Sequence, residues 1–95
     1  MTITSVQNPR VKAAARLRDR AGRDDQGRII IDGVREISRA IAAGVEVVEL
    51  FFFAELCREA DHQRLLESAK KARAELIEVA PHIMEKLSLD RKSVV

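Results

Sequence analysis

The chain contains very few of the residues from which catalytic and metal sites are usually built. Cys57 is its only cysteine, so no internal disulfide is possible, and a reduced, cytoplasmic setting is expected. His62 and His82 lie twenty positions apart without a cysteine or acid at metal-ligand spacing, so we expect both at the surface near helix starts. Gly33 stands alone where a phosphate-binding loop needs two or three glycines. We therefore expect a binding module, with no catalytic set, metal or cofactor held by these residues.

Long apolar runs and aromatic side chains are also scarce. No stretch approaches the roughly 20 apolar residues of a membrane span, and the opening MTITSVQNPR lacks the hydrophobic segment of a signal peptide. The aromatic residues are confined to Phe51, Phe52 and Phe53. A length of 95 residues suits one domain with a modest core. We expect a single soluble intracellular domain, with no membrane partner.

Positive charge is concentrated at the beginning of the chain. Residues 1–28 carry seven basic side chains against three acidic ones, whereas residues 29–60 carry three against six. Six of those seven basic residues are arginine, the side chain best suited to bidentate phosphate contacts and to stacking on bases. The imbalance favours a nucleic-acid partner. The alternative is a helix whose charged face is merely solvated.

The stretch Arg28–Phe53 has the pattern of a strand, a helix and a second strand. Ile29–Ile31 is short, apolar and β-branched, which predicts a buried strand. A helical period starts at Val34, and Gly44 stands where a left-handed C-cap residue is expected. Val45–Phe53, polar only at its two glutamates, predicts the second strand. Together they predict a compact β-α-β unit.

The turn inside this unit is a candidate anion site. Asp32 is expected to cap the helix, and Gly33 to adopt the dihedral angles that the turn requires. Free N–H groups at the helix start suit a phosphate, and Arg35 and Arg39, one turn apart, could contact neighbouring phosphates or an unpaired base. The alternative is that Asp32 is an ordinary cap and that Arg35 and Glu36 make exposed ion pairs of little energetic value.

A basic helix is predicted before this unit. Asn8-Pro9 marks its start, the helix reaches about Ala21, Gly22 ends it, and Arg23–Gly27 forms a polar turn. Basic side chains recur at spacings of three and four on one outer face, which comprises Lys12, Arg16, Arg20 and Arg23 and is interrupted by Asp19. Combined with the turn described above, the candidate RNA-binding residues are Asn8, Arg10, Lys12, Arg16, Arg20, Arg23, Gly33, Arg35 and Arg39.

The second half of the chain continues the alternation of helix and strand. Ala54–Ala60 is either a loop or an irregular helical turn. Three further elements are predicted: a helix over His62–Arg73 capped by Asp61, a strand over Glu75–Val79, and a helix starting at Pro81 with Ile83, Met84 and Leu87 inward. Leu89–Val95 resembles the approach to another strand. This order predicts an α/β fold, a three-layer α/β/α arrangement with a small, mostly parallel sheet.

Several residues, taken in order, resemble the start of a known enzyme family. They are Ser5-x-x-Asn8-Pro9-x-Val11-Lys12, Leu17, Asp32-Gly33-x-Arg35-Glu36, Ala40 and Gly44, Leu50-Phe51, and Pro81, Met84 and Leu87-Ser88. The combination covers nearly the whole chain and resembles the SpoU (TrmH-like) RNA methyltransferases. Asp32 replaces their usual glutamate and preserves the carboxylate. Ala80 replaces a serine that would cap the last helix, which should weaken the cap by about 1 kcal/mol.

The resemblance implies that residues 1–95 are an N-terminal RNA substrate-binding domain with a fold like that of kink-turn-binding ribosomal proteins. In the family a knotted α/β domain follows, which binds S-adenosylmethionine, methylates a ribose 2′-hydroxyl and forms the homodimer. Its glycine- and asparagine-rich cofactor motifs are absent from these residues. The implied function is RNA recognition, of ribosomal RNA first, by a non-catalytic domain of a 2′-O-methyltransferase. The alternatives are a stand-alone RNA-binding protein of the same fold and a protein-interaction domain.

Overall fold

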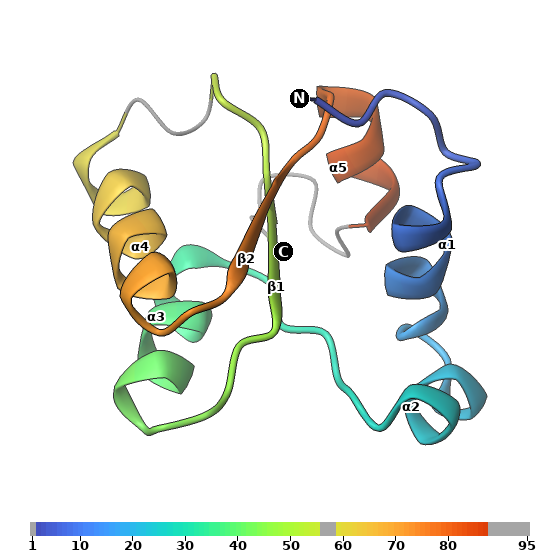
Figure 1. Ribbon diagram of the computed structural model, residues 1–95, viewed down its shortest axis with the longest axis horizontal. Coiled ribbons are helices and arrows are strands. Elements are labelled where there is room, and N and C mark those ends of the chain that lie inside the picture. Colours follow the sequence, from blue (N-terminus) through green and yellow to red (C-terminus); the bar gives the residue numbers. More distant parts are fainter. Residues whose placement is uncertain (1, 56–58, 88–95) are drawn as a thin grey trace.

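The computed structural model describes residues 2–55 and 59–87 and contains a small sheet between helices. The elements are α1 (Pro9–Arg16), α2 (Arg20–Gln26), α3 (Val34–Ala42), β1 (Glu49–Phe52), α4 (Ala60–Lys71), β2 (Glu75–Glu78) and α5 (Pro81–Leu87). The strands pair in parallel, and an isolated parallel bridge joins Ile3 to Val79 on the far side of β2. Figure 1 shows α3 and α4 on one side of the strands and α1 and α5 on the other. The predicted three-layer α/β/α fold is confirmed.

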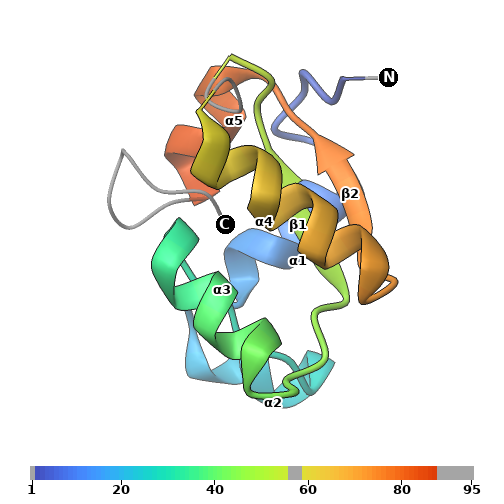
Figure 2. The same cartoon turned by 90° about the vertical axis from the view of Figure 1, so that its left-hand side faces the viewer.

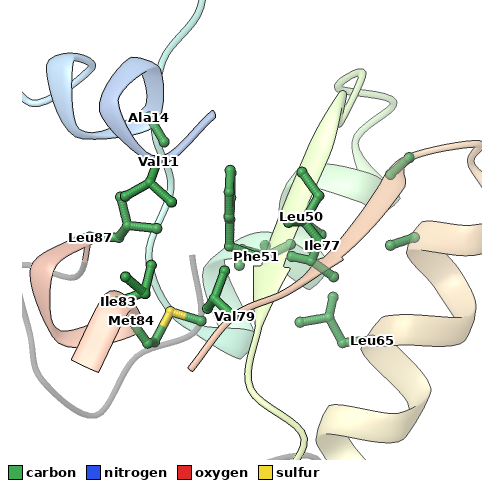
Figure 3. Packing of buried hydrophobic residues seen from close by; sticks show 13 residues of the cluster. Val11, Ala14, Leu50, Phe51, Leu65, Ile77, Val79, Ile83, Met84 and Leu87 are labelled. Carbon is green, nitrogen blue, oxygen red and sulfur yellow. The ribbon is translucent and has the colours of Figure 1, made fainter. Parts of the chain in front are cut away.

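The core lies on both sides of the strands. Its buried members come from α1, α3, both strands, α4 and α5, and no buried residue in the described ranges is polar or charged. Figure 3 shows Val11 of α1 beside Leu87 of α5, with Phe51 of β1 toward the same side and Leu65 of α4 on the other. The predicted inward face of α5 is confirmed, because Ile83 and Met84 are also buried.

The prediction that Ile29–Ile31 forms a buried strand is wrong. The three residues line a cavity of about 530 Å³ beside β1, and the first of them is 67% exposed. Their backbone makes no hydrogen bond with another backbone group of the described residues. Ion pairs hold the ends of this segment instead. Arg28 lies 3.3 Å from Glu49 at one end, and Asp32 lies 3.0 Å from Arg18 at the other.

The second predicted strand is shorter than expected. Only Glu49–Phe52 of the range Val45–Phe53 belongs to β1. Val45 and Val48 are exposed, because the chain joins the sheet only where β2 offers partners, from Glu49 opposite Glu75 onward. The prediction for β2 is confirmed to within one residue.

The first predicted helix is broken into two. α1 ends at Arg16, and α2 begins at Arg20 and continues through Gly22 to Gln26, so neither the helix end at Gly22 nor the polar turn after it is correct. Gly22 is buried, and a Cβ atom there would lie 2.0 Å from the carbonyl oxygen of Arg16. The glycine is therefore required for the close approach of α2 to the end of α1, and it does not terminate a helix.

Two predicted helix caps are wrong, whereas the predicted cap of α1 agrees with the structure. α3 begins at Val34 with Gly33, not Asp32, at the N-cap, and no side chain caps it. α4 begins at Ala60, and Asp61 lies in its first turn. The start of α1 is confirmed, because the side chain of Asn8 accepts a hydrogen bond from the backbone N–H of Arg10 at 2.9 Å.

Some predictions concern residues outside the described ranges. These are the middle of Ala54–Ala60, which includes Cys57, and the segment Leu89–Val95. Among the helices of the described ranges, none has both the length and the apolar character needed to cross a membrane.

Replacing Gly22 with alanine should destabilise the domain by about 2 kcal/mol, although alanine is normally the better helix former. The added Cβ would enter space that the Arg16 carbonyl already occupies. Urea unfolding followed by circular dichroism measures the change. The matched control is Gly44→Ala, where nothing lies within 4 Å of the added Cβ and only the strain of a positive φ remains, at about 1 kcal/mol. A Gly22→Ala variant as stable as the wild type would show that this packing requirement is absent.

Candidate nucleic-acid interface

The predicted RNA-binding residues occupy two separate surfaces. One comprises Asn8, Arg10, Lys12, Arg16, Arg20 and Arg23 on or beside α1 and α2, and the other comprises Gly33, Arg35 and Arg39 at α3. These two groups of helices lie on opposite sides of the strands in Figure 1. The exposed faces of the basic helices and of α3 are therefore separated by the strands, although the turn before α3 contacts the segment between α1 and α2 through Arg18 and Asp32.

The basic residues of α1 and α2 do not form one stripe, because the helix breaks between Arg16 and Arg20. Arg16 lies 3.7 Å from Asp25, and Arg20 lies 3.9 Å from Asp24. All four side chains are exposed, so these ion pairs are weak and a phosphate could replace either carboxylate.

Arg23 turns inward instead of outward. Its Nη1 atom donates to the carbonyl oxygens of Leu17 and Arg18, at 3.2 and 3.0 Å. These carbonyls follow the end of α1, where the helix leaves acceptors without intrahelical partners. In this conformation Arg23 stabilises the break between α1 and α2, and the prediction that it shares an outer face with Lys12 is wrong.

Arg10 belongs to a network of charges at the N-terminal ends of the two strands. Its Nη2 atom donates to Glu75 Oε1 at 2.8 Å, and its Nη1 atom contacts the other carboxylate oxygen. Arg10 Nε also lies 4.0 Å from Glu49, which pairs with Arg28. The hydrogen bond from Arg10 lowers the pKa of Glu75 and raises the pKa of Arg10. A phosphate that bound Arg10 would therefore have to compete with a bidentate carboxylate.

Lys12, Arg35 and Arg39 are the predicted cations that remain available. All three are exposed, and none makes an ion pair with a residue of the described ranges 2–55 and 59–87. Arg35 lies in the first turn of α3, beside backbone N–H groups that have no intrahelical acceptor. Arg39 lies one turn further along. The start of α3 therefore combines the guanidinium group of Arg35 with the positive end of a helix dipole, an arrangement that can bind an anion, whereas Arg39 lies in the last turn of the helix.

Gly33 and Glu36 shape the turn that leads into α3. Gly33 has a φ angle of 95°, a backbone conformation that residues other than glycine rarely adopt. A Cβ atom at this position would also lie 2.5 Å from Oε2 of Glu36, which folds back over the turn. The prediction that glycine is needed here is confirmed.

Arg18 is the residue of this region that sequence reasoning missed. Its Nη2 atom lies 3.0 Å from both carboxylate oxygens of Asp32 and also donates to the backbone carbonyl of Leu87. The Arg18 and Asp32 side chains are only 20% and 15% exposed. This contact joins the α1–α2 turn, the segment before α3 and the end of α5. Asp32, which preserves the carboxylate of the family, could have pointed to Arg18. A carboxylate that does not cap a helix needs another hydrogen-bond or ion-pair partner.

The two histidines differ in their surroundings. His82 is exposed, as predicted, and its Nε2 atom lies 2.8 Å from the carbonyl oxygen of Thr4. His62 is wrongly predicted as a surface residue, because its side chain is 13% exposed and its Nδ1 atom lacks a hydrogen bond. Within the described part of the chain, no three acidic, histidine or cysteine side chains are grouped so that they could hold a metal ion.

Replacing Arg18 with methionine should lower the free energy of unfolding by about 2 kcal/mol, because two largely buried acceptors would lose a donor. Asp32→Asn should also destabilise the domain, and the double variant should cost less than the sum of the two single variants. Urea unfolding of all four proteins measures the coupling. Arg20→Met is the control for loss of an exposed arginine, with an expected cost below about 0.5 kcal/mol. Strictly additive costs would contradict a direct Arg18–Asp32 interaction.

The stabilising effect of Glu75 should depend on pH. Its pKa in the folded protein lies below the ordinary value of 4.5, so its stabilising effect is complete above that pH and disappears as the pH falls through the folded-state pKa. Wild type should therefore be more stable than Glu75→Gln at neutral pH, and the difference should shrink in acid. Thermal unfolding of both proteins across this range tests the expectation. A difference that stayed constant with pH would show that the Arg10–Glu75 pair does not form.

Comparisons with known proteins agree with this architecture. The family model of the MRM3-like substrate binding domain matches residues 8–93. Among solved structures, the chain is similar to one described as the crystal structure of an RNA 2′-O ribose methyltransferase, with 39% sequence identity and a TM-score of 0.79. The similarity covers 95% of this chain and 33% of that one, so the chain spans about a third of that protein.

No match is found among curated proteins. The match of the family model over nearly the whole chain and the structural similarity agree on the same kind of domain. The expected substrate-binding domain is thereby confirmed: the chain belongs to the family of MRM3-like substrate-binding domains.

Proposed function

We propose that this chain is the RNA-recognition domain of an RNA ribose 2′-O-methyltransferase of the SpoU type. The observation that carries the proposal is the 39% identity, across 95% of the chain, to an RNA 2′-O ribose methyltransferase. The available cations of α3, Arg35 and Arg39, support RNA as the ligand. Ribosomal RNA as the substrate, a cytoplasmic location and a homodimeric parent protein are parts of the same proposal.

Methyl transfer is assigned to another part of the parent enzyme. S-adenosylmethionine would supply the methyl group, but the residues described here do not fit it. The cavity of about 530 Å³ beside Ile29–Ile31 is lined largely by aliphatic side chains and lacks a glycine-rich turn between a strand and a helix. The role of this domain is therefore to bind and orient RNA.

RNA contact is proposed at the start of α3, with additional phosphate contacts from Lys12, Arg16 and Arg20. Arg35 in the first turn of α3 and Arg39 one turn further along make no ion pair with a described residue, whereas the charge of Arg10 is compensated by Glu75. Binding to backbone phosphates releases counterions, so the affinity should fall steeply with salt. A stand-alone RNA-binding protein is not favoured, because the similar structure is that of an enzyme.

The variants Arg35→Ala and Arg20→Ala distinguish specific from general RNA contact. Arg35→Ala should weaken binding about tenfold and reduce discrimination between a kink-turn ribosomal RNA fragment and a random RNA of equal length. Arg20→Ala should weaken the binding of both RNAs equally, because the exposed Arg20 side chain offers only a phosphate contact. Fluorescence anisotropy at low and physiological salt measures both effects, after melting temperatures have been shown to be unchanged.

Two outcomes would contradict the proposal. Equal effects of the two substitutions on both RNAs would leave the α3 turn with a structural role only. No affinity of the wild-type domain for either RNA at low salt would reject RNA recognition and favour a protein-interaction domain.

A further inference from the structure

A groove between α3 and α4 lies next to the proposed RNA contact. Its volume is about 500 Å³, and α3 contributes Val34, Arg35 and Ser38 while α4 contributes Asp61, Arg64, Leu65 and Ser68. Figure 2 shows the two helices facing the viewer. Leu65 is buried and Val34 is half-buried, whereas the other lining residues are exposed. The groove thus combines apolar residues near the core with polar and charged side chains near solvent.

The charged groups of the groove are predominantly positive. Arg35 makes no ion pair with a residue of the described ranges, and Arg64 donates to the carboxylate of Asp61 one turn away on α4. Both members of the Arg64–Asp61 pair are exposed, so water and salt weaken their attraction. An incoming phosphate can therefore take the place of Asp61 on Arg64.

The donors in the groove suit a phosphodiester. A guanidinium group can donate two parallel hydrogen bonds to phosphate oxygens. Arg35 and Arg64 supply such groups from opposite walls, and Ser38 and Ser68 add a hydroxyl donor on each wall. No described group in the groove other than Asp61 carries negative charge.

We propose that this groove holds the RNA backbone, with one phosphodiester between Arg35 and Arg64. The inference rests on the proposed function and extends its site from α3 onto α4. Arg35 belongs both to the α3 turn and to the groove, so an RNA strand that reaches Gly33 continues between the helices. Asp61 competes with the phosphate for Arg64, so RNA binding breaks the Arg64–Asp61 ion pair.

Four single variants on α4 test this site, each with one charge removed. Arg64→Gln and Asp61→Asn alter the groove. Lys70→Gln is the control for Arg64→Gln, and Glu67→Gln is the control for Asp61→Asn. Each control residue lies six positions after its counterpart, so its side chain is rotated by about 240° around the helix axis. Lys70 and Glu67 are exposed, and neither lines the groove.

Binding of the kink-turn ribosomal RNA fragment is measured by fluorescence anisotropy between low and physiological salt. Arg64→Gln should weaken binding about tenfold and reduce the log–log salt slope by about 1, as expected for one lost phosphate contact. Lys70→Gln should change affinity less than about twofold, because its charge acts only at a distance. Unchanged melting temperatures of the variants exclude unfolding as the cause.

Asp61→Asn provides the opposite test. Removal of the competing carboxylate should strengthen binding about threefold, whereas Glu67→Gln should have a smaller effect. In the Arg64→Gln background, Asp61→Asn should give no such gain, because the contact that it releases is gone.

The failure of this inference is distinguishable from the failure of the proposed function. If the wild type binds RNA but Arg64→Gln and Lys70→Gln have equal effects, the groove is rejected and RNA recognition stands. A gain from Asp61→Asn that persists without Arg64 would also reject the groove. If the wild type shows no RNA affinity at low salt, the proposed function and the groove both fail.

Discussion

The contact of Arg18 with Asp32 and with the Leu87 carbonyl is the interaction on which the rest of this domain depends. It joins three segments that are far apart in the sequence: the α1–α2 turn, the residues before α3 and the end of α5. A single guanidinium group can do this because its donors are arranged in a fixed, planar fork. The position of Gly33, and hence of the available arginines on α3, follows from where this contact holds Asp32.

Ion pairing within the domain determines which positive charges face a ligand. Arg10 pairs with Glu75 and Arg18 pairs with Asp32, whereas Arg23 donates to backbone carbonyls. Lys12 and the two arginines of α3 have no such partner among the described residues. A net charge of +2 therefore gives a poor picture of the surface, because the charge that a ligand meets is set by contacts between distant parts of the chain.

The sequence was sufficient for features that depend on a few neighbouring residues. The Asn8 cap, the start of α3, the strand β2 and the inward face of α5 all follow from local patterns and agree with the structure. Ile29–Ile31 has an equally clear local pattern, but a strand also needs a neighbouring backbone as its partner, and the sequence does not specify one. Local propensity and pairing are different requirements.

The residues missed at the candidate site were missed for a related reason. Gly22 was interpreted as a helix end, whereas its role comes from the carbonyl of Arg16 packed against it. Nothing in the sequence pattern of α4 distinguishes Arg64, and only the packing of α3 beside α4 places it opposite Arg35. Each role depends on two elements meeting in space, which neither element's own sequence pattern reveals.

The bridge between Ile3 and Val79 has a consequence for how the domain folds. Ile3 donates to Glu78 and accepts from Ala80, and Thr2 and Thr4 contact Glu78 and His82 nearby. The first residues of the described chain are thus ordered by some of the last. Pairing Ile3 with Val79 closes a long stretch of chain, which costs conformational entropy, so we expect these contacts to form late in folding. α1 packs on α5 as well as on α2, so during synthesis its packing is complete only after α5 has left the ribosome.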